Sequence, residues 1–218
     1  MRAKYQAHIR KIAVIILLAF PSNLLPKRPL NLTIAKNEVI KYYTSGRYEK
    51  DLKKIVNRAI KHFKKVRLHE KQTIIFDIDN TILSTFPLEK SVSFGCTPFH
   101  KWALEARAPV IPEVKRLYDY LVNQGFKIVF LTSRKYNEYD ATIKNLKREG
   151  IITFDKLIVR QPHELKIKTV DYKSSCRKEL TEQGYNIVGT IGDQQSDLDG
   201  PHAGYRVKIP NYLYISLS

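Results

Sequence analysis

The sequence contains little cysteine and no apolar run long enough to cross a membrane as a helix. Its two cysteines, Cys96 and Cys176, are too few for a disulfide framework or for a structural zinc site with four cysteine ligands. Nine glycines and ten prolines in 218 residues exclude collagen-like and low-complexity material. The remaining composition, with 43% apolar and 27% charged residues, is that of one globular domain with room for a small insert.

Several catalytic signatures are also missing. The positions six residues after the cysteines hold Trp102 and Glu182, where a cysteine-dependent phosphatase needs an arginine. The sequence has no GxxxxGKS/T loop, no GxSxG elbow and no HExxH motif. These absences exclude the corresponding enzyme classes. Whether the two cysteines pair with each other is left open by the sequence.

Acidic residues are scarce in the first third of the chain. Residues 1–71 hold 18 basic and 4 acidic side chains, a net charge of +14, whereas residues 72–218 hold 20 and 17, a net charge of +3. A nucleic-acid-binding chain more often spreads its positive charge over the recognition fold, so we expect no specific nucleic acid recognition. The basic character belongs to a segment that precedes a nearly balanced domain.

The first 25 residues are typical of a secretory signal. Four basic residues and no acidic one precede nine consecutive apolar residues at 12–20, which Pro21 follows. Nine residues cannot span a hydrocarbon core, which needs about 20. Because no A-x-A cleavage pattern follows, we expect either a signal peptide or an uncleaved signal anchor, with the rest of the protein exported to the periplasm or secreted. A buried strand or helix start is the structural alternative.

Residues 26–71 predict a basic linker followed by helices. Two prolines favour an extended chain over 26–34, and a short helix is expected over 35–43. Over 48–66 apolar residues recur at helical spacing, and the other side of that helix is basic, with Lys53, Lys54, Arg58, Lys61, Lys64 and Lys65. This basic side is either a solvated face or a contact surface for acidic lipid headgroups or a polyanion.

After residue 71 short apolar runs alternate with amphipathic helices. Strands are expected at 73–78, 126–131, 156–160, 186–191 and 206–209. Helices are expected at 112–123, 138–149 and 173–183. Repeated βα units with continuous apolar strands predict an α/β fold, in which helices cover both faces of a parallel sheet. Ligands of such folds bind beyond the carboxyl ends of the strands, where the strand order reverses.

Reactive side chains stand at the predicted carboxyl ends of these strands and on one helix. They are four carboxylates, two hydroxyls and one ammonium: Asp77, Asp79, Asp193, Asp197, Thr132, Ser133 and Lys173. Carboxylates that lie so close raise each other's pKa values unless a cation stabilises their charge. Because the available ligands are oxygen atoms, the pattern predicts Mg²⁺.

This set of residues predicts phosphoryl chemistry. Asp77 is placed to attack phosphorus and form an aspartyl-phosphate, and Asp79 to protonate the leaving oxygen and then deprotonate water. Thr132 and Ser133 are expected to bind phosphate oxygens, while Lys173 and Mg²⁺ offset their charge. Phosphotransfer to an alcohol on the same scaffold and a non-enzymatic anion-binding or storage protein are the alternatives.

The motifs resemble those of the haloacid-dehalogenase superfamily of phosphohydrolases. FDIDNTILS at 76–84, FLTSR at 130–134 and GYNIVGTIGDQQSDLDG at 184–200 are similar to the class B-like acid phosphatases of subfamily IIIB. That group includes plant vegetative storage proteins and bacterial secreted acid phosphatases. The likeness covers roughly residues 37–214.

The resemblance implies a Rossmann-like core with a small cap, Mg²⁺-dependent hydrolysis of small phosphomonoesters, and a homodimer. It also implies metal binding by Asp77, by the backbone carbonyl of Asp79 and by Asp193. Asp197 is then expected to support these ligands without contacting the metal itself. The family often has tryptophan at position 195 and glycine at position 133, where this chain has Gln195 and Ser133. We expect these departures to affect the shape of the substrate rather than activity.

The segment 84–111, at the start of the 72–218 phosphatase core, is longer than a crossover between strand and helix requires and predicts the cap. Its aromatic residues Phe94, Phe99 and Trp102 are candidates for a stacking surface against an aromatic or nucleoside leaving group. The alternative is that they form the cap's own small core or a dimer contact. His100 is expected to be a surface or packing residue.

Overall fold

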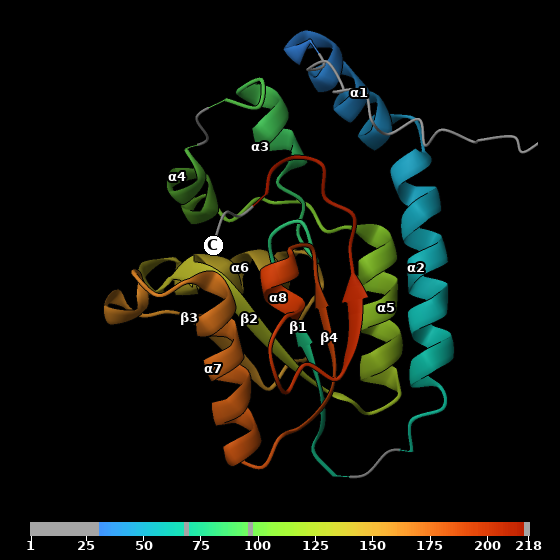
Figure 1. The fold of residues 1–218 in the computed structure, drawn as a ribbon, viewed down its shortest axis with the longest axis vertical. Coiled ribbons are helices and arrows are strands. Elements are labelled where there is room, and N and C mark those ends of the chain that lie inside the picture. Colours follow the sequence, from blue (N-terminus) through green and yellow to red (C-terminus); the bar gives the residue numbers. More distant parts are fainter. Residues whose placement is uncertain (1–30, 68–69, 96–97, 216–218) are drawn as a thin grey trace, which may run out of the picture. The chain divides into compact units, whose positions relative to one another are not determined.

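The computed structural model describes residues 31–67, 70–95 and 98–215 (Figure 1). The predicted leader, residues 26–30 of the linker and Cys96 lie outside these residues. Cys176 is described, and it is a buried free thiol. No helix among the described residues is both long and apolar enough to span a membrane.

A five-stranded parallel sheet forms the centre of the fold. Its strands lie in the order β3-β2-β1-β4-β5. Their bounds are β1 Gln72–Phe76, β2 Lys127–Lys135, β3 Lys156–Arg160, β4 Asn186–Gly192 and β5 Tyr205–Lys208. The chain runs outward from β1 to β3 and then returns to the other side of β1, so the strand order reverses at β1. The predicted α/β class is thereby confirmed, and β1 and β4 form the switch point.

Two strands differ from the prediction at the edge that matters for the site. The first strand ends at Phe76, so Asp77 already lies in the loop. β2 runs four residues further than expected. Its register against β3 shifts after Leu131, because Leu131 pairs with Ile158 and Lys135 with Arg160. An advance of four residues along β2 thus matches an advance of two along β3. The extra residues of β2 form a bulge at Thr132–Arg134.

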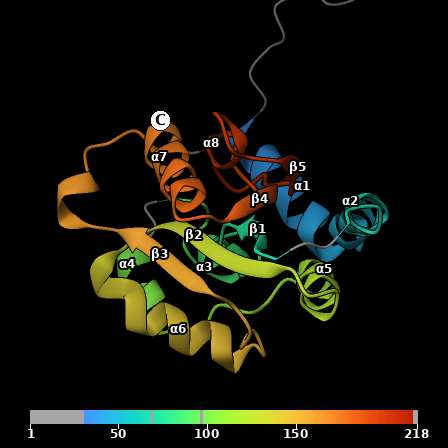
Figure 2. The same cartoon turned by 90° about the horizontal axis from the view of Figure 1, so that it is seen from below.

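Helices cover both faces of the sheet, as Figure 2 shows: α7 and α8 lie on one side, α5 and α6 on the other. They span α5 Pro112–Asn123, α6 Tyr139–Arg148, α7 Thr169–Glu182 and α8 Gln195–Leu198, with short 3-10 turns at Tyr136–Glu138 and Pro162–Glu164. Alternate strand residues supply the two cores. Ile75 packs with Tyr172 and Cys176 of α7, whereas Phe76 packs with Tyr118 of α5.

The N-terminal helices pack into the main core. They are α1 Leu32–Thr44 and α2 Arg47–Phe63. Phe63 of α2 packs against Gly189 of β4, where an added Cβ would lie 2.6 Å from the ring. The expectation of an extended chain over 26–34 is wrong for residues 32–34, which are helical. Proline restricts only its own backbone and that of the residue before it. Pro29 therefore does not prevent a helix from starting at Leu32.

The predicted cap is a pair of short helices between β1 and α5. These are α3 Phe86–Ser91 and α4 Phe99–Leu104, and both lie beyond the carboxyl edge of the sheet (Figure 1). The two ends of the insert meet, because Leu83 bridges to Val110 and the Ser84 N–H donates to the Pro109 carbonyl at 2.8 Å. Both ends of the cap therefore join the core next to the end of β1.

Candidate active site

The turn after β1 places two aspartates at the edge of the sheet. The Asp77 N–H donates to the Ile191 carbonyl of β4 at 2.9 Å, and this bond fixes the loop beside the neighbouring strand. Asn80 takes a positive φ of 57°, and its side-chain oxygen accepts hydrogen bonds from the amide and hydroxyl of Thr85. The Thr81 hydroxyl lies 3.0 Å from Asp77 Oδ2 and 3.2 Å from Asp193 Oδ1. Thr81 thus links the loops that follow β1 and β4.

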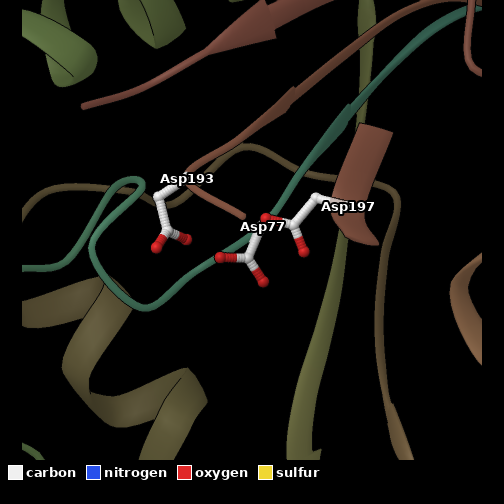
Figure 3. Close-up of side chains that lie close together, drawn as sticks. All are labelled: Asp77, Asp193 and Asp197. Carbon is white, nitrogen blue, oxygen red and sulfur yellow. The ribbon is translucent and has the colours of Figure 1, made fainter. Parts of the chain in front are cut away.

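Three buried carboxylates come together at this point. Asp77, Asp193 and Asp197 each offer an oxygen within 4.8 Å of the others, although 116 positions separate Asp77 from Asp193. Figure 3 shows the three side chains directed toward a common space. Asp77 follows β1, Asp193 follows β4 and Asp197 belongs to α8. The structure therefore joins three of the aspartates that the sequence predicted to converge.

Lys173 is the cation that contacts this group. Its Nζ donates to Asp77 Oδ1 at 2.6 Å and to Asp197 Oδ1 at 2.5 Å, and the side chain is buried. Burial disfavours the charge on Lys173, but the attraction of Asp197 and Asp77 outweighs it and raises the lysine pKa. The sequence placed Lys173 at the start of a helix, whereas α7 begins at Thr169. Lys173 thus lies one turn inside α7.

One ammonium does not neutralise three carboxylates. Burial raises the pKa of Asp77 well above its usual value; Lys173 opposes this effect, while Asp197 and Asp193 add to it. Burial and Asp197 likewise raise the pKa of Asp193, although hydrogen bonds from Asn211 and Gln194 oppose that shift. Both amides donate to Asp193 Oδ2 at 2.6 Å. When all three carboxylates are ionised, the group carries two negative charges more than Lys173 offsets.

A divalent cation fits this arrangement. The donors are carboxylate oxygens, and Mg²⁺ prefers oxygen ligands over nitrogen or sulfur ligands. Because Lys173 leaves about two negative charges uncompensated, a doubly charged cation would balance the cluster and lower the raised carboxyl pKa values. Asp197 accepts a hydrogen bond from Lys173 Nζ at Oδ1 and from the Gln194 N–H at Oδ2, so both of its oxygens already have a donor.

Asp79 does not join the three carboxylates through its side chain. Instead it forms a two-point ion pair with Arg134 of β2, in which Nε donates to Oδ2 at 3.0 Å and Nη2 to Oδ1 at 2.7 Å. Arg134 is fully buried, and its Nη1 donates to the Thr142 hydroxyl of α6. Arg134 is the last residue of the FLTSR motif, and the sequence analysis gave it no role. Its contact with Asp79 requires two strands that are distant along the chain.

A cavity of about 460 Å³ opens above these residues. Asp77, Asp79, Asp193, Asp197, Thr132, Ser133 and Lys173 all line it, so the predicted set shares one pocket. Thr132 is buried; its hydroxyl accepts the Arg134 N–H at 3.2 Å and retains its own proton to donate. Ser133 is exposed at the pocket wall.

The outer wall of the pocket is aromatic and apolar. Phe94 and Phe99 of the cap line it, as predicted, but Trp102 does not. Trp102 of α4 is buried and borders a separate cavity of the cap, which Leu88 of α3 also lines. The sequence analysis missed Leu213 and Tyr214, which close the pocket from the C-terminal segment. No local pattern marks them, since Asn211 brings that segment over the site by bonding Asp193.

His100 follows Phe99 and connects the cap to the core. Its Nδ1 lies 2.7 Å from Oε1 of buried Glu138, which belongs to the turn after β2. His100 is exposed, so it is a surface residue of the cap, in line with the expectation of a surface or packing residue.

Comparison with known proteins agrees with this geometry. The family model described as HAD superfamily, subfamily IIIB (acid phosphatase) matches residues 29–217. The stem 28 kDa glycoprotein of Glycine max is 39% identical, over 81% of this chain and 73% of that protein. Acid phosphatase 1 of Solanum lycopersicum is 32% identical, over 82% of this chain and 73% of that protein.

A solved structure gives the same result for the fold. The class C acid phosphatase from Bacillus anthracis with tungstate bound has a TM-score of 0.67 and 25% identity, over 84% of this chain and 85% of that one. The likeness to plant vegetative storage proteins is also confirmed. The chain belongs to subfamily IIIB of the haloacid-dehalogenase superfamily, an acid phosphatase family, and is a phosphomonoesterase.

Proposed function

We propose that this enzyme hydrolyses small phosphomonoesters with Mg²⁺ through an aspartyl-phosphate on Asp77. The observation that carries the proposal is the buried group of Asp77, Asp193 and Asp197 around a single lysine, at the end of the strand where the sheet order reverses. The bound tungstate of the Bacillus anthracis relative supports it, because tungstate is a tetrahedral oxyanion like phosphate.

Asp77 is oriented for attack by two contacts. Lys173 donates to its Oδ1 and Thr81 to its Oδ2, so the carboxylate cannot turn away from the pocket. A carboxylate oxygen of Asp77 forms a bond to phosphorus while the bond from phosphorus to the ester oxygen breaks. Thr132 and Ser133 at the pocket wall would donate to phosphate oxygens, and Lys173 offsets part of the charge.

Asp79 would carry the proton in both steps. In its protonated form it gives the proton to the leaving alcohol oxygen. As a carboxylate it then takes a proton from water, which attacks phosphorus and frees Asp77. Arg134 holds the Asp79 carboxylate at the pocket wall through two hydrogen bonds. This restraint keeps Asp79 close to the position of the leaving group.

Asp77 and Asp193 would hold the Mg²⁺ together with the backbone carbonyl of Asp79, and Asp197 would stay with Lys173. The bound ion supplies positive charge that stabilises the transferring phosphoryl group. Phe94, Phe99 and Tyr214 form the apolar wall that the leaving group would meet. Trp102 has no part in this proposal.

Replacement of Asp77 by asparagine tests the enzyme proposal. We expect the wild type with Mg²⁺ to hydrolyse p-nitrophenyl phosphate, EDTA to abolish the activity, and Asp77→Asn to reduce it by at least about 10³-fold. Asp119→Asn on the exposed side of α5 is the matched control and should be near normal. Equal rates for the wild type and Asp77→Asn would favour the anion-binding or storage alternative. Transfer of the phosphoryl group to added glycerol would favour phosphotransfer.

Export and homodimer formation stay proposals. The leader of residues 1–25 supports export to the periplasm or secretion, and cell fractionation of the full chain tests it. The cap cavity bordered by Trp102 and Leu88 also holds charged side chains and is a candidate surface for a partner copy; the molar mass in solution tests the dimer.

A further inference from the structure

The outer side of α2 carries a continuous stripe of positive charge. At 3.6 residues per turn, the buried residues Leu52, Val56 and Phe63 take one side of the helix. The opposite side, extended by two residues beyond the helix end, consists of Lys50, Lys53, Lys54, Arg58, Lys61, Lys64 and Lys65. All seven side chains are exposed. We call these seven residues the basic stripe.

Almost nothing in the described part of the chain neutralises the basic stripe. Lys54 lies 3.3 Å from Asp51, and both side chains are exposed. Water screens this ion pair, so it offsets little of the charge of the basic stripe. The other six cations form no ion pair with any described residue. The like charges in this row repel one another, and an anionic surface that approaches them lowers their electrostatic free energy.

The charge continues onto the neighbouring strand. A cavity of about 240 Å³ between α2 and β5 is lined by Arg58, Arg206 and Lys208, with the ring of Tyr205 at its side. Arg206 donates to the Gly200 carbonyl at 3.2 Å, and its nearest described carboxylate is that of Asp199 at 3.9 Å, so its charge is only weakly offset. The basic stripe thereby broadens at Arg58 into a cationic surface formed by two elements.

The character of the stripe favours a diffuse anionic surface over a specific ligand. Six of the seven residues are lysines, which are flexible point charges, whereas recognition of individual phosphates more often uses the guanidinium fork of arginine. The 17 residues of α2 make a straight element about 25 Å long, which suits a flat partner.

The sequence ahead of the helices points to a membrane as that partner. Four basic residues precede the apolar run at 12–20, the order found in signals that enter a bilayer. Residues 21–31 separate this run from α1, and eleven residues span at most about 40 Å. We propose that the basic stripe docks the enzyme on an anionic phospholipid surface.

Docking through α2 would leave the catalytic pocket open. The pocket lies beyond the carboxyl ends of the strands, whereas α2 runs along the side of the fold, next to α5 (Figure 1). No residue of the basic stripe lines that pocket. Bound and free enzyme should therefore hydrolyse a soluble ester at the same rate.

Co-sedimentation of the full chain with vesicles tests the proposal. Vesicles of phosphatidylcholine are compared with vesicles that also contain phosphatidylserine, at low and at high salt. The stripe variant carries Lys54→Gln, Arg58→Gln and Lys61→Gln, which keep a good helix former at each position. The control variant carries Lys144→Gln, Lys147→Gln and Lys166→Gln, which remove the same charge from exposed positions elsewhere.

At about 1 kcal/mol for each basic residue, the stripe variant should bind phosphatidylserine vesicles about 100-fold more weakly than the wild type. The control should stay within about twofold, and salt should weaken wild-type binding. Both variants should keep wild-type hydrolysis of p-nitrophenyl phosphate, which shows that they fold. Equal loss in the two variants, no dependence on phosphatidylserine, or binding to heparin without binding to vesicles would overturn the proposal. These outcomes do not depend on the catalytic mechanism.

Discussion

Replacement of Lys173 by methionine should make the stability of this protein depend on metal. Lys173 Nζ contacts Asp77 at 2.6 Å and Asp197 at 2.5 Å, and all three side chains are buried. Methionine keeps much of the length of the side chain and removes its charge. The variant then holds three buried carboxylates without the cation that contacts two of them.

The size of the effect follows from the cost of leaving a buried charge unpaired. Removal of one partner of a buried ion pair typically lowers the free energy of unfolding by about 3–5 kcal/mol. For a chain of this length each kcal/mol lowers the melting temperature by roughly 2–4 °C, so in EDTA we expect a melting temperature about 10 °C below that of the wild type. Added Mg²⁺ should stabilise Lys173→Met more than the wild type, because the empty site of the variant carries one more negative charge.

Thermal unfolding in EDTA and in Mg²⁺ measures this difference. Lys178→Met is the matched control, since Lys178 lies on the same helix but is exposed and 3.8 Å from Glu182. The pKa values of Asp77 and Asp193 are raised in the folded state, so the folded protein binds these protons more tightly than the unfolded chain. Lowering the pH until Asp77 and Asp193 take up protons should therefore reduce the difference in melting temperature between Lys173→Met and the wild type. The reasoning would be refuted if both lysine variants melted together in EDTA near neutral pH.

Two further predictions concern buried groups around the site. Arg134→Met should lower kcat by up to about 10²-fold with little change in KM, because Asp79 loses the two hydrogen bonds that position it; steady-state kinetics measure this, and an unchanged kcat would contradict the role of Arg134. Cys176, whose pKa burial raises to about 11, should resist Ellman's reagent at pH 8 in a Cys96→Ser background until the protein is unfolded. Rapid labelling of the native protein would contradict the buried position of Cys176.

Helix α7 connects the chemistry of the site to its support. Lys173 and Arg177 are four residues apart and therefore share one side of the helix. Lys173 binds the side chain of Asp197, and Arg177 donates to the backbone carbonyls of Asp197, Asp199 and Pro201. One helix face thus fixes both the Asp197 carboxylate and the backbone from Asp197 to Pro201.

The sequence by itself determined the α/β class and most of the site. Continuous apolar strands that alternate with helices admit a parallel sheet, and in such a sheet the carboxyl ends of the strands share an edge. Asp77 and Asp193 directly follow β1 and β4, so their convergence follows from the topology of the sheet. Thr132 lies inside β2, at its bulge, and lines the same pocket. The bounds of α5 and β3 agree with the prediction because Pro112 fixes the start of α5 and clear turn residues flank β3.

Only the tertiary structure decided which side chains pair and which face the pocket. Asp79 turns to Arg134 because the β2 bulge brings a buried guanidinium next to it, and no local pattern reports a bulge. Trp102 faces α3 rather than the pocket, and Tyr214 reaches the pocket because Asn211 bonds Asp193. These contacts join residues far apart along the chain. Their choice depends on packing and charge in three dimensions, which composition and spacing do not contain.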